Sequence, residues 1–175
     1  MAHWEPVLTD LIATRGRALT AYATMLCGNS SEGEDLTQEA LTKVFTTLRR
    51  RSRDDALEYA EAYVRRTIFS LYLDRARRQQ RWSAVRHLFT RTDASDHNGR
   101  APAWVDSAGD RVDVQRALQT LTERQRACTV LRYYADLTVP QIADELYLSA
   151  GAVKRYLHEA KGRLARVLAV EGDQS

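Results

Sequence analysis

Residues 136–164 read DLTVPQIADELYLSAGAVKRYLHEAKGRL and set the architecture of this chain. Thr138 is suited to cap a helix, and Gln141 follows three residues later, at the spacing of a capping box. Apolar residues at 139, 142, 143 and 146 then repeat at helical spacing. Ser149 offers a second N-cap, and a second apolar stripe runs from Val153 to Leu164. Two short helices joined by a three-residue turn predict a helix-turn-helix.

The second helix of this motif carries small and basic residues on its predicted outer face. These residues are Ala150, Gly151, Lys154, Arg155, His158 and Lys161. Small residues let the start of a helix approach base edges in the major groove, while basic residues reach phosphates. A helical hairpin with a solvated charged face is the alternative, but capping, turn length and charge together favour DNA binding. Tyr147 stands where such turns need a left-handed residue, so it is strained or the turn has another shape.

The composition indicates a soluble globular protein. The chain has 175 residues, 44% hydrophobic and 28% charged, which suits one domain or two small ones. A net charge of +3 is too small to indicate nucleic-acid binding by itself. Evidence for such binding must come from the distribution of charge along the chain. Cys27 and Cys128 lack metal-ligand spacing and are expected to be buried free thiols, and no metal or cofactor is predicted. Neither an apolar run long enough to span a membrane nor a leader is visible, so we expect a cytoplasmic protein.

Three helices are predicted in the first half, over residues 5–27, 32–50 and 56–81. The second begins with acidic residues. Glu32 and Glu34 suit the positive end of the helix dipole, which is a sufficient structural explanation for them. Further along, Asp35, Gln38 and Glu39 could also face a partner.

The third helix concentrates positive charge. Seven arginines and one acid, Asp74, lie between residues 65 and 86. Projected at 100° per residue, one outward arc contains Arg65, Arg66, Phe69, Ser70, Leu73, Arg77 and Arg81. Plain solvated faces are normally mixed in sign. Arginines with interleaved aromatics are instead typical of a platform for single-stranded nucleic acid.

Residues 87–110 lose periodicity and are rich in turn residues, which predicts a flexible linker in which Trp104 docks on something. Helices resume at residue 113, and Thr122 with Gln125 forms another capping box. No stretch alternates as a strand does. The predicted fold is all-α, with two small helical domains joined by a flexible linker.

The chain resembles the extracytoplasmic-function (ECF) sigma factors of the sigma-70 family, which direct bacterial RNA polymerase to promoters. The resemblance covers nearly the whole length and rests on motifs found in the family's order. They are EDLTQEAL (34–41), AYVRR (62–66), YLDRARR (72–78), LTERQR (121–126), IADEL (142–146) and SAGAVK (149–154).

The resemblance implies a domain at residues 1–86, a linker at 87–110 and a helix-turn-helix domain at 111–175. The implied partners are promoter DNA and core RNA polymerase, through the clamp helices of its largest subunit and its flap; an anti-sigma factor is a further possible partner. The implied clamp contacts are Asp35, Leu36, Gln38 and Glu39. The implied minus-ten contacts are Arg49, Arg50, Arg51, Arg53, Arg65, Arg66, Phe69, Ser70, Arg77, Arg78 and Arg81. The implied minus-thirty-five contacts are Ser149, Ala150, Gly151, Ala152, Lys154, Arg155, His158 and Lys161.

The chain departs from the family pattern at several DNA-facing positions, so the promoter sequence does not follow from the resemblance. The family commonly has Asn at Ser70, Gly at Tyr147 and Thr at Ala152, and further arginines at Tyr156 and Glu159.

Two other function classes are alternatives to a sigma factor. An operator-binding regulator with a helical ligand-sensing domain shares the helix-turn-helix, but it leaves the arginine-rich third helix unexplained. An enzyme has little support, because the four histidines are scattered and no carboxylate pair or nucleophile motif is visible. We therefore expect no catalysis by this chain.

Overall fold

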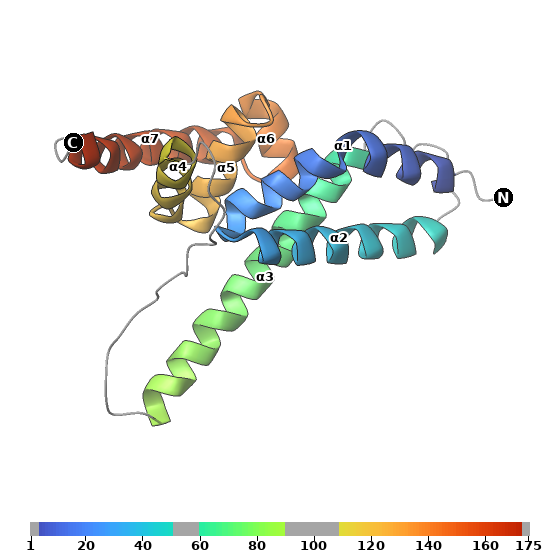
Figure 1. Cartoon of the computed structure of the whole chain (residues 1–175), viewed down its shortest axis with the longest axis horizontal. Coiled ribbons are helices and arrows are strands. Elements are labelled where there is room, and N and C mark those ends of the chain that lie inside the picture. Colours follow the sequence, from blue (N-terminus) through green and yellow to red (C-terminus); the bar gives the residue numbers. More distant parts are fainter. Residues whose placement is uncertain (1–3, 51–59, 90–108, 173–175) are drawn as a thin grey trace.

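The computed structural model describes residues 4–50, 60–89 and 109–172, and within these ranges the secondary structure is helical (Figure 1). The helices are α1 (Trp4–Cys27), α2 (Ser30–Arg50), α3 (Ala60–Phe89), α4 (Gly109–Gln119), α5 (Glu123–Tyr133), α6 (Val139–Leu146) and α7 (Ala150–Gly172). The predicted all-α class is confirmed.

Both predicted capping boxes are present. The backbone N–H of Gln125 donates to the Thr122 hydroxyl at 3.4 Å, and the backbone N–H of Thr122 donates to the Gln125 side chain at 3.2 Å. Thr138 and Gln141 make the same pair of bonds at 3.5 and 2.8 Å. Each box satisfies two backbone donors that a helix start leaves free, and so fixes where α5 and α6 begin.

The predicted linker is shorter than expected at both ends. α3 continues to Phe89, and α4 begins at Gly109, so residues 87–89 and 109–110 are helical. The sequence signal faded after residue 81 because a helix that leaves the core no longer needs an apolar stripe. Gly109 and Asp110 read as breakers, yet both residue types also suit a helix start. Trp104 and the rest of the linker lie outside the described residues, as does the predicted start of the third helix.

α1, α2 and α3 form the first group of helices. α1 packs closely on α2 because Gly33 has no side chain: a Cβ there would lie 2.4 Å from the Thr24 hydroxyl oxygen. Gly28 ends α1 with φ +81°, a backbone conformation that glycine adopts without strain. Large buried side chains fill the space between the three helices. They include Leu19, Tyr22, Leu26, Leu36, Val44, Val64 and Ile68.

α4 to α7 form the second group. Leu131 of α5, Ile142 of α6 and Val153 of α7 are fully buried, and they hold the predicted helix-turn-helix against α5. In Figure 1 this group lies beside α1 and the upper part of α3, while the far end of α3 projects away from the rest of the molecule.

The two groups share one buried apolar cluster, which the sequence did not predict. α4 and α5 pack on α1, and α6 packs on α3. Two glutamines of α4 reinforce this contact, because the Gln115 and Gln119 side-chain amides donate to the carbonyls of Thr24 and Met25 at 2.9 and 3.4 Å. In this conformation, therefore, the second group of helices lies against the first.

Candidate functional site

The outer face of α7 is open and basic, as predicted. The Ser149 hydroxyl accepts the backbone N–H of Ala152 at 3.1 Å and so caps the helix. Val153 and Ala160 turn inward and are fully buried. The exposed residues on the other side are Ala150, Gly151, Lys154, Arg155, His158 and Lys161, while Ala152 is half-buried. A helix with its apolar side buried and its small and basic side free is able to enter a major groove.

The turn before α7 has the usual left-handed geometry, although its first residue is Tyr147. The backbone of Tyr147 has φ 52° and ψ 48°, and its N–H donates to the carbonyl of Ala143. A side chain in this conformation costs about 1–2 kcal/mol, because its Cβ crowds the following carbonyl. The first of the two predicted alternatives, a strained residue, is therefore the one observed.

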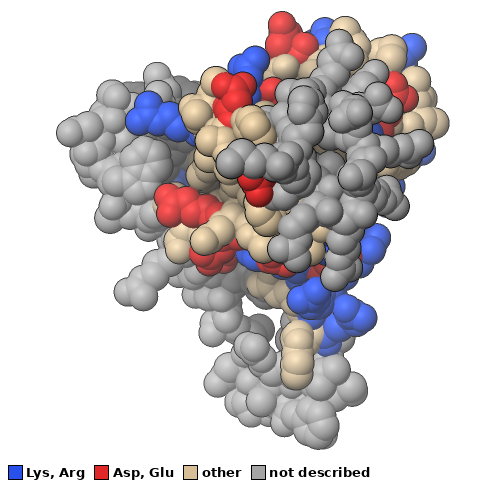
Figure 2. Space-filling model, turned by 90° about the vertical axis from the view of Figure 1, so that its right-hand side faces the viewer, with Lys and Arg blue, Asp and Glu red and all other residues tan. Residues whose placement is uncertain are grey.

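The far part of α3 carries exposed positive charge. Ser70, Arg77, Arg78 and Arg81 are exposed, and the Trp82 ring beyond them is 71% exposed. The Arg77 guanidinium lies 3.7 Å from the Asp74 carboxylate. In Figure 2 basic side chains lie low in the view, toward the part of the molecule where α3 projects.

Phe69 does not belong to this exposed surface, contrary to the predicted arc. Its side chain is only 6% exposed. The projection assumed a helix with a single buried side, whereas α3 packs against α1 and α2 and also against α6. Phe69 is therefore a core residue in this conformation, and Leu73 is half-buried.

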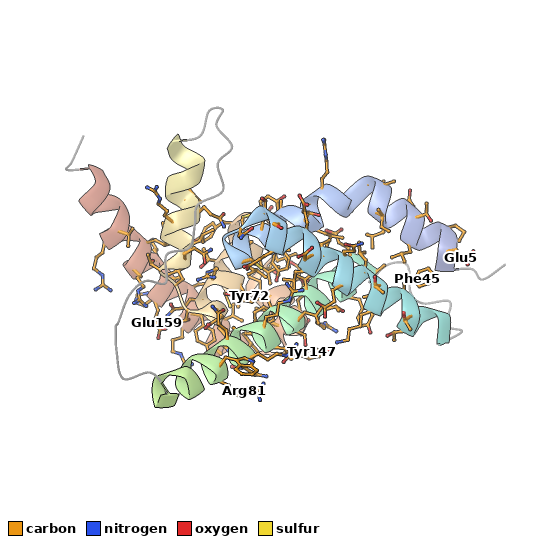
Figure 3. The ribbon with its side chains drawn as sticks, turned by 60° about the horizontal axis from the view of Figure 1, so that its bottom comes forward. Glu5, Phe45, Tyr72, Arg81, Tyr147 and Glu159 are labelled. Carbon is orange, nitrogen blue, oxygen red and sulfur yellow. The ribbon has the colours of Figure 1, made fainter. Side chains whose placement is uncertain are left out.

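Arg65 and Arg66 lie near the start of α3, where α6 covers them. The Arg65 guanidinium forms a two-bond fork with the Glu145 carboxylate, at 2.7 and 3.0 Å, and also donates to Glu61 at 2.6 Å. Burial lowers the pKa of Arg65, but the hydrogen bond and charge of Glu145, with the charge of Glu61, outweigh burial and raise it. The Arg66 guanidinium carbon lies 4.2 Å from the centre of the Tyr147 ring. Figure 3 shows Tyr147 next to the α3 ribbon.

Glu145 was not among the site residues predicted from the sequence. A signal was present, because Glu145 lies three residues after Ile142, on the side of α6 that carries its apolar stripe. An acid on an apolar side indicates a buried partner of opposite charge. The Glu145 residue is 4% exposed, and its carboxylate is paired with Arg65.

The acidic helix α2 offers a polar surface. Asp35, Gln38 and Glu39 are exposed, and they line a shallow open depression together with Thr42, Lys43, Thr46 and Thr47. Arg75 donates to the Glu39 carboxylate at 2.6 Å. Leu36, also predicted to contact a partner, is fully buried instead. Its side chain holds α2 on the core, because it belongs to the apolar stripe of that helix.

The remaining predicted residues fall at the edge of the described part. Arg49 and Arg50 form the last turn of α2, without a described side chain, and Arg51 and Arg53 lie outside the described residues. Residues 4–50, 60–89 and 109–172 contain no group of three histidines, cysteines or acids that could hold a metal ion. Among the described helices, none is long and apolar enough to cross a membrane. Burial raises the pKa of Cys27 to about 11 and that of Cys128 to about 12, which disfavours reactive thiolates.

Comparison with protein-family models assigns both groups of helices. The model of sigma-70 region 2 matches residues 11–82, which lie in α1, α2 and α3. The model of sigma-70 region 4 matches residues 111–164, which extend from α4 into α7. The chain belongs to the sigma-70 family.

Known sigma factors are similar to this one along most of its length. It is 28% identical over 172 residues to the RNA polymerase sigma-E factor of Streptomyces avermitilis, covering 96% of this chain and 89% of that protein. It is 29% identical over 143 residues to the ECF RNA polymerase sigma factor SigL of Mycobacterium tuberculosis, covering 81% and 77%. These matches confirm the resemblance to ECF sigma factors.

A solved structure has the same fold. It is the sigma factor RpoE of Bartonella quintana, crystallised in complex with the anti-sigma factor NepR. The TM-score is 0.69 at 20% identity, covering 93% of this chain and 96% of that one.

As a member of this family, the sigma factor is a transcription initiation factor that binds core RNA polymerase and directs it to promoter DNA. The alternative of an operator-binding regulator is not favoured.

Proposed function

We propose that this sigma factor reads promoters with two separate surfaces, duplex DNA with α7 and the opened strand with α3. The observation that carries the proposal is the exposed basic face of α7, whose opposite side is fully buried at Val153 and Ala160. A net charge of +3 supplies little affinity for DNA by counterion release. The factor therefore depends on polymerase for most of its affinity and contributes selectivity through a few well-placed side chains.

At the minus-thirty-five element, the cap of α7 approaches the bases and the cations flank it. The small residues at the cap, Ser149, Ala150, Gly151 and Ala152, leave room for base edges. Further along α7, Lys154, Arg155, His158 and Lys161 reach bases or phosphates. Glu159 lies 3.9 Å from the Arg155 guanidinium and weakens the positive potential locally.

At the minus-ten element, α3 holds the opened strand, with the exposed surface of its far part and with Arg65 and Arg66 near its start. Swinging a base out of the duplex costs a few kcal/mol, and stacking on an aromatic ring returns about 1–3 kcal/mol per base. Trp82 is the exposed ring on this surface, and arginines supply the backbone contacts. The residues of α3 that make these contacts are Arg65, Arg66, Ser70, Arg77, Arg78 and Arg81. Arg49 and Arg50 at the end of α2 join them, as do Arg51 and Arg53, which follow α2 in the sequence.

Polymerase is held by the exposed side of α2. Asp35, Gln38 and Glu39 face the clamp helices of the largest subunit, while the helix-turn-helix domain reaches the flap. The first domain extends through α3 to residue 89 and the second begins with α4 at residue 109, and the linker between them lies along the polymerase in the complex. The chain itself catalyses nothing, and it works in the cytoplasm, where polymerase and chromosome meet.

Run-off transcription with core polymerase, on a promoter mapped from genomic fragments, tests whether α7 reads duplex DNA and α3 binds the opened strand. Arg77→Ala with Arg78→Ala removes two exposed cations of α3, and we expect it to block initiation on duplex template. A template already mismatched at the minus-ten element restores activity to this variant, because the cost of opening is gone.

Two matched variants complete the design. Lys154→Ala weakens the duplex contact upstream, so premelting gives it no selective rescue. Arg17→Ala with Arg116→Ala removes the same charge from exposed positions outside both surfaces, and it should transcribe like wild type. Equal rescue of the α3 and α7 variants by premelting, or rescue of neither, contradicts the proposed roles of α3 and α7.

A further inference from the structure

The contact between α3 and α6 occupies two arginines that the proposed function gives to DNA. In the Arg65–Glu145 pair the arginine side chain is 12% exposed and the carboxylate side chain 5%. A two-bond fork of this kind is strong and directional, and a buried one is screened little by salt. A DNA phosphate therefore reaches Arg65 only after the Glu145 carboxylate has left.

Arg66 is held by three further groups. Its Nε donates to the carbonyl of Glu145 at 3.1 Å, and its Nη2 donates to the carbonyl of Asp144 at 2.9 Å. Its Nη1 donates to the Tyr147 hydroxyl at 2.6 Å. The last carbonyls of a helix have no partner within it, so Arg66 completes the end of α6.

Tyr147 has a strained backbone, so the presence of a tyrosine here needs an explanation in the contacts that its side chain makes. A glycine would adopt φ 52° without strain, and a tyrosine adopts it at a cost. The ring contributes nothing to the core of its own domain, since the residue is 77% exposed. Its described contacts are with Arg66, through the ring and through the hydroxyl. The strained residue therefore serves the contact with α3.

Two groups of α6 and its turn resemble parts of a nucleotide, and both bind arginines of α3. The Glu145 carboxylate accepts a guanidinium fork as a phosphate does. The Tyr147 ring stacks on a guanidinium as a base does. The two ligands of α3, protein and DNA, therefore compete for the same donors.

The closed arrangement also contains a defect that favours opening. The Tyr22 hydroxyl of α1 is buried, and it has no hydrogen-bond partner among the described residues. The carboxylate of Glu145 and the guanidinium of Arg65 both act on it electrostatically, so it lies close to the contact. A buried hydroxyl without a partner costs free energy in the closed state, which makes that state easier to leave.

We propose that Glu145 and Tyr147 form a latch that holds Arg65 and Arg66 in the polymerase-free sigma factor, so that α3 cannot engage minus-ten DNA until α6 moves away. This inference rests on the proposed function, which assigns both arginines to that DNA. Core polymerase opens the latch by binding the separated regions. The apparent affinity for DNA rises in proportion to the fraction of molecules that are open.

The test uses the full-length free protein and a short fluorescein-labelled oligothymidylate, which probes stacking and backbone contacts without a known promoter sequence. Glu145→Gln keeps the shape of the side chain and removes the ion pair. Tyr147→Gly removes the ring at an exposed position and relieves the backbone strain, so it leaves the domain folded. We expect each variant to bind the strand roughly tenfold more tightly than wild type. We also expect a larger radius of gyration by small-angle X-ray scattering.

Two control variants match these changes. Asp144→Asn removes one exposed negative charge beside Glu145, and the described contact of Asp144 with Arg66 is made by its backbone carbonyl. Tyr133→Ala removes an aromatic ring that is 74% exposed, on α5 of the same region. Both controls should bind oligothymidylate like wild type.

Unchanged strand binding and unchanged scattering in Glu145→Gln and Tyr147→Gly, with both proteins folded by circular dichroism, would overturn the latch. A different experiment tests the proposed function. If wild-type protein with core polymerase gives no promoter-specific transcript, the function fails, whatever the scattering shows.

Discussion

Arg126 of α5 supports a quantitative prediction, because its guanidinium joins both groups of helices. It is 7% exposed and donates to the carbonyls of Leu118, Gln119 and Leu121, at 2.8, 3.1 and 3.1 Å. These carbonyls lie in the last turn of α4 and just beyond it. Across the contact it donates to the carbonyl of Leu26, in the last turn of α1, and to a tyrosine hydroxyl of α3 at 2.8 Å. A cation at two helix C-termini satisfies carbonyls that the helices cannot, and it also suits both dipoles.

Replacing Arg126 by alanine leaves these acceptors without a donor. A buried group left unsatisfied costs about 1–3 kcal/mol. Three of the five acceptors are carbonyls in or beside the turn at Gln119 and Thr120, whose residues are exposed, so a rearrangement of this turn in the variant brings water to them most easily. The carbonyl of Leu26 and the hydroxyl of Tyr72 lie deeper. Two such losses, together with the lost packing of the arginine stem, predict that the free energy of unfolding falls by about 3–4 kcal/mol.

Urea denaturation followed by far-ultraviolet circular dichroism measures this loss, with linear extrapolation to water. Arg124→Ala removes an exposed arginine two positions earlier and should change stability by less than about 0.5 kcal/mol. Tyr72→Phe removes one acceptor only and should cost about 1 kcal/mol. The double variant Arg126→Ala with Tyr72→Phe should cost less than the sum of the two singles, because they share a bond. A loss below about 1 kcal/mol for Arg126→Ala would refute the role assigned to this side chain.

Three further outcomes are expected. Asp35→Arg with Glu39→Arg should abolish co-elution with core polymerase in size-exclusion chromatography while the protein stays helical, and unchanged binding would exclude this side of α2 as the clamp contact. Thr138→Ala removes one half of a capping box and should lower the free energy of unfolding by about 0.5–2 kcal/mol in urea, against no change if the cap is unimportant. Because burial raises the pKa of Cys27 to about 11 and that of Cys128 to about 12, both thiols stay protonated at pH 8. Mass spectrometry should therefore find iodoacetamide labelling of native protein far slower than labelling in urea, and equal rates would contradict the burial.

The parts of the fold that depend on local chemistry were predictable from the sequence. Thr122 and Thr138 each precede a glutamine by three residues, and a bond pattern confined to one helix turn needs no knowledge of the rest of the chain. The same holds for the exposed face of α7, because inward residues such as Val153 and Ala160 repeat at helical spacing.

The parts that depend on packing between distant helices were not predictable. Arg65 and Glu145 are separated by 80 residues, and the residues around each of them do not indicate that the two form a pair. Phe69 was predicted to be exposed because α3 was treated as a helix with one packed side. Leu36 matched a partner-binding motif, and the motif alone does not say which of its residues point inward.

The shared use of α3 has a consequence for how such a factor changes over generations. In the proposed function Arg65 and Arg66 bind two ligands, promoter DNA in the complex with polymerase and α6 with its turn in the free protein. A substitution that alters promoter preference at either arginine also alters how long the free protein stays closed. A compensating change at residue 145 or 147 would then be needed to keep the polymerase-free protein closed and unable to bind DNA. Promoter preference is therefore coupled to the stability of the closed state through Arg65 and Arg66, whereas residues 145 and 147 change that stability alone.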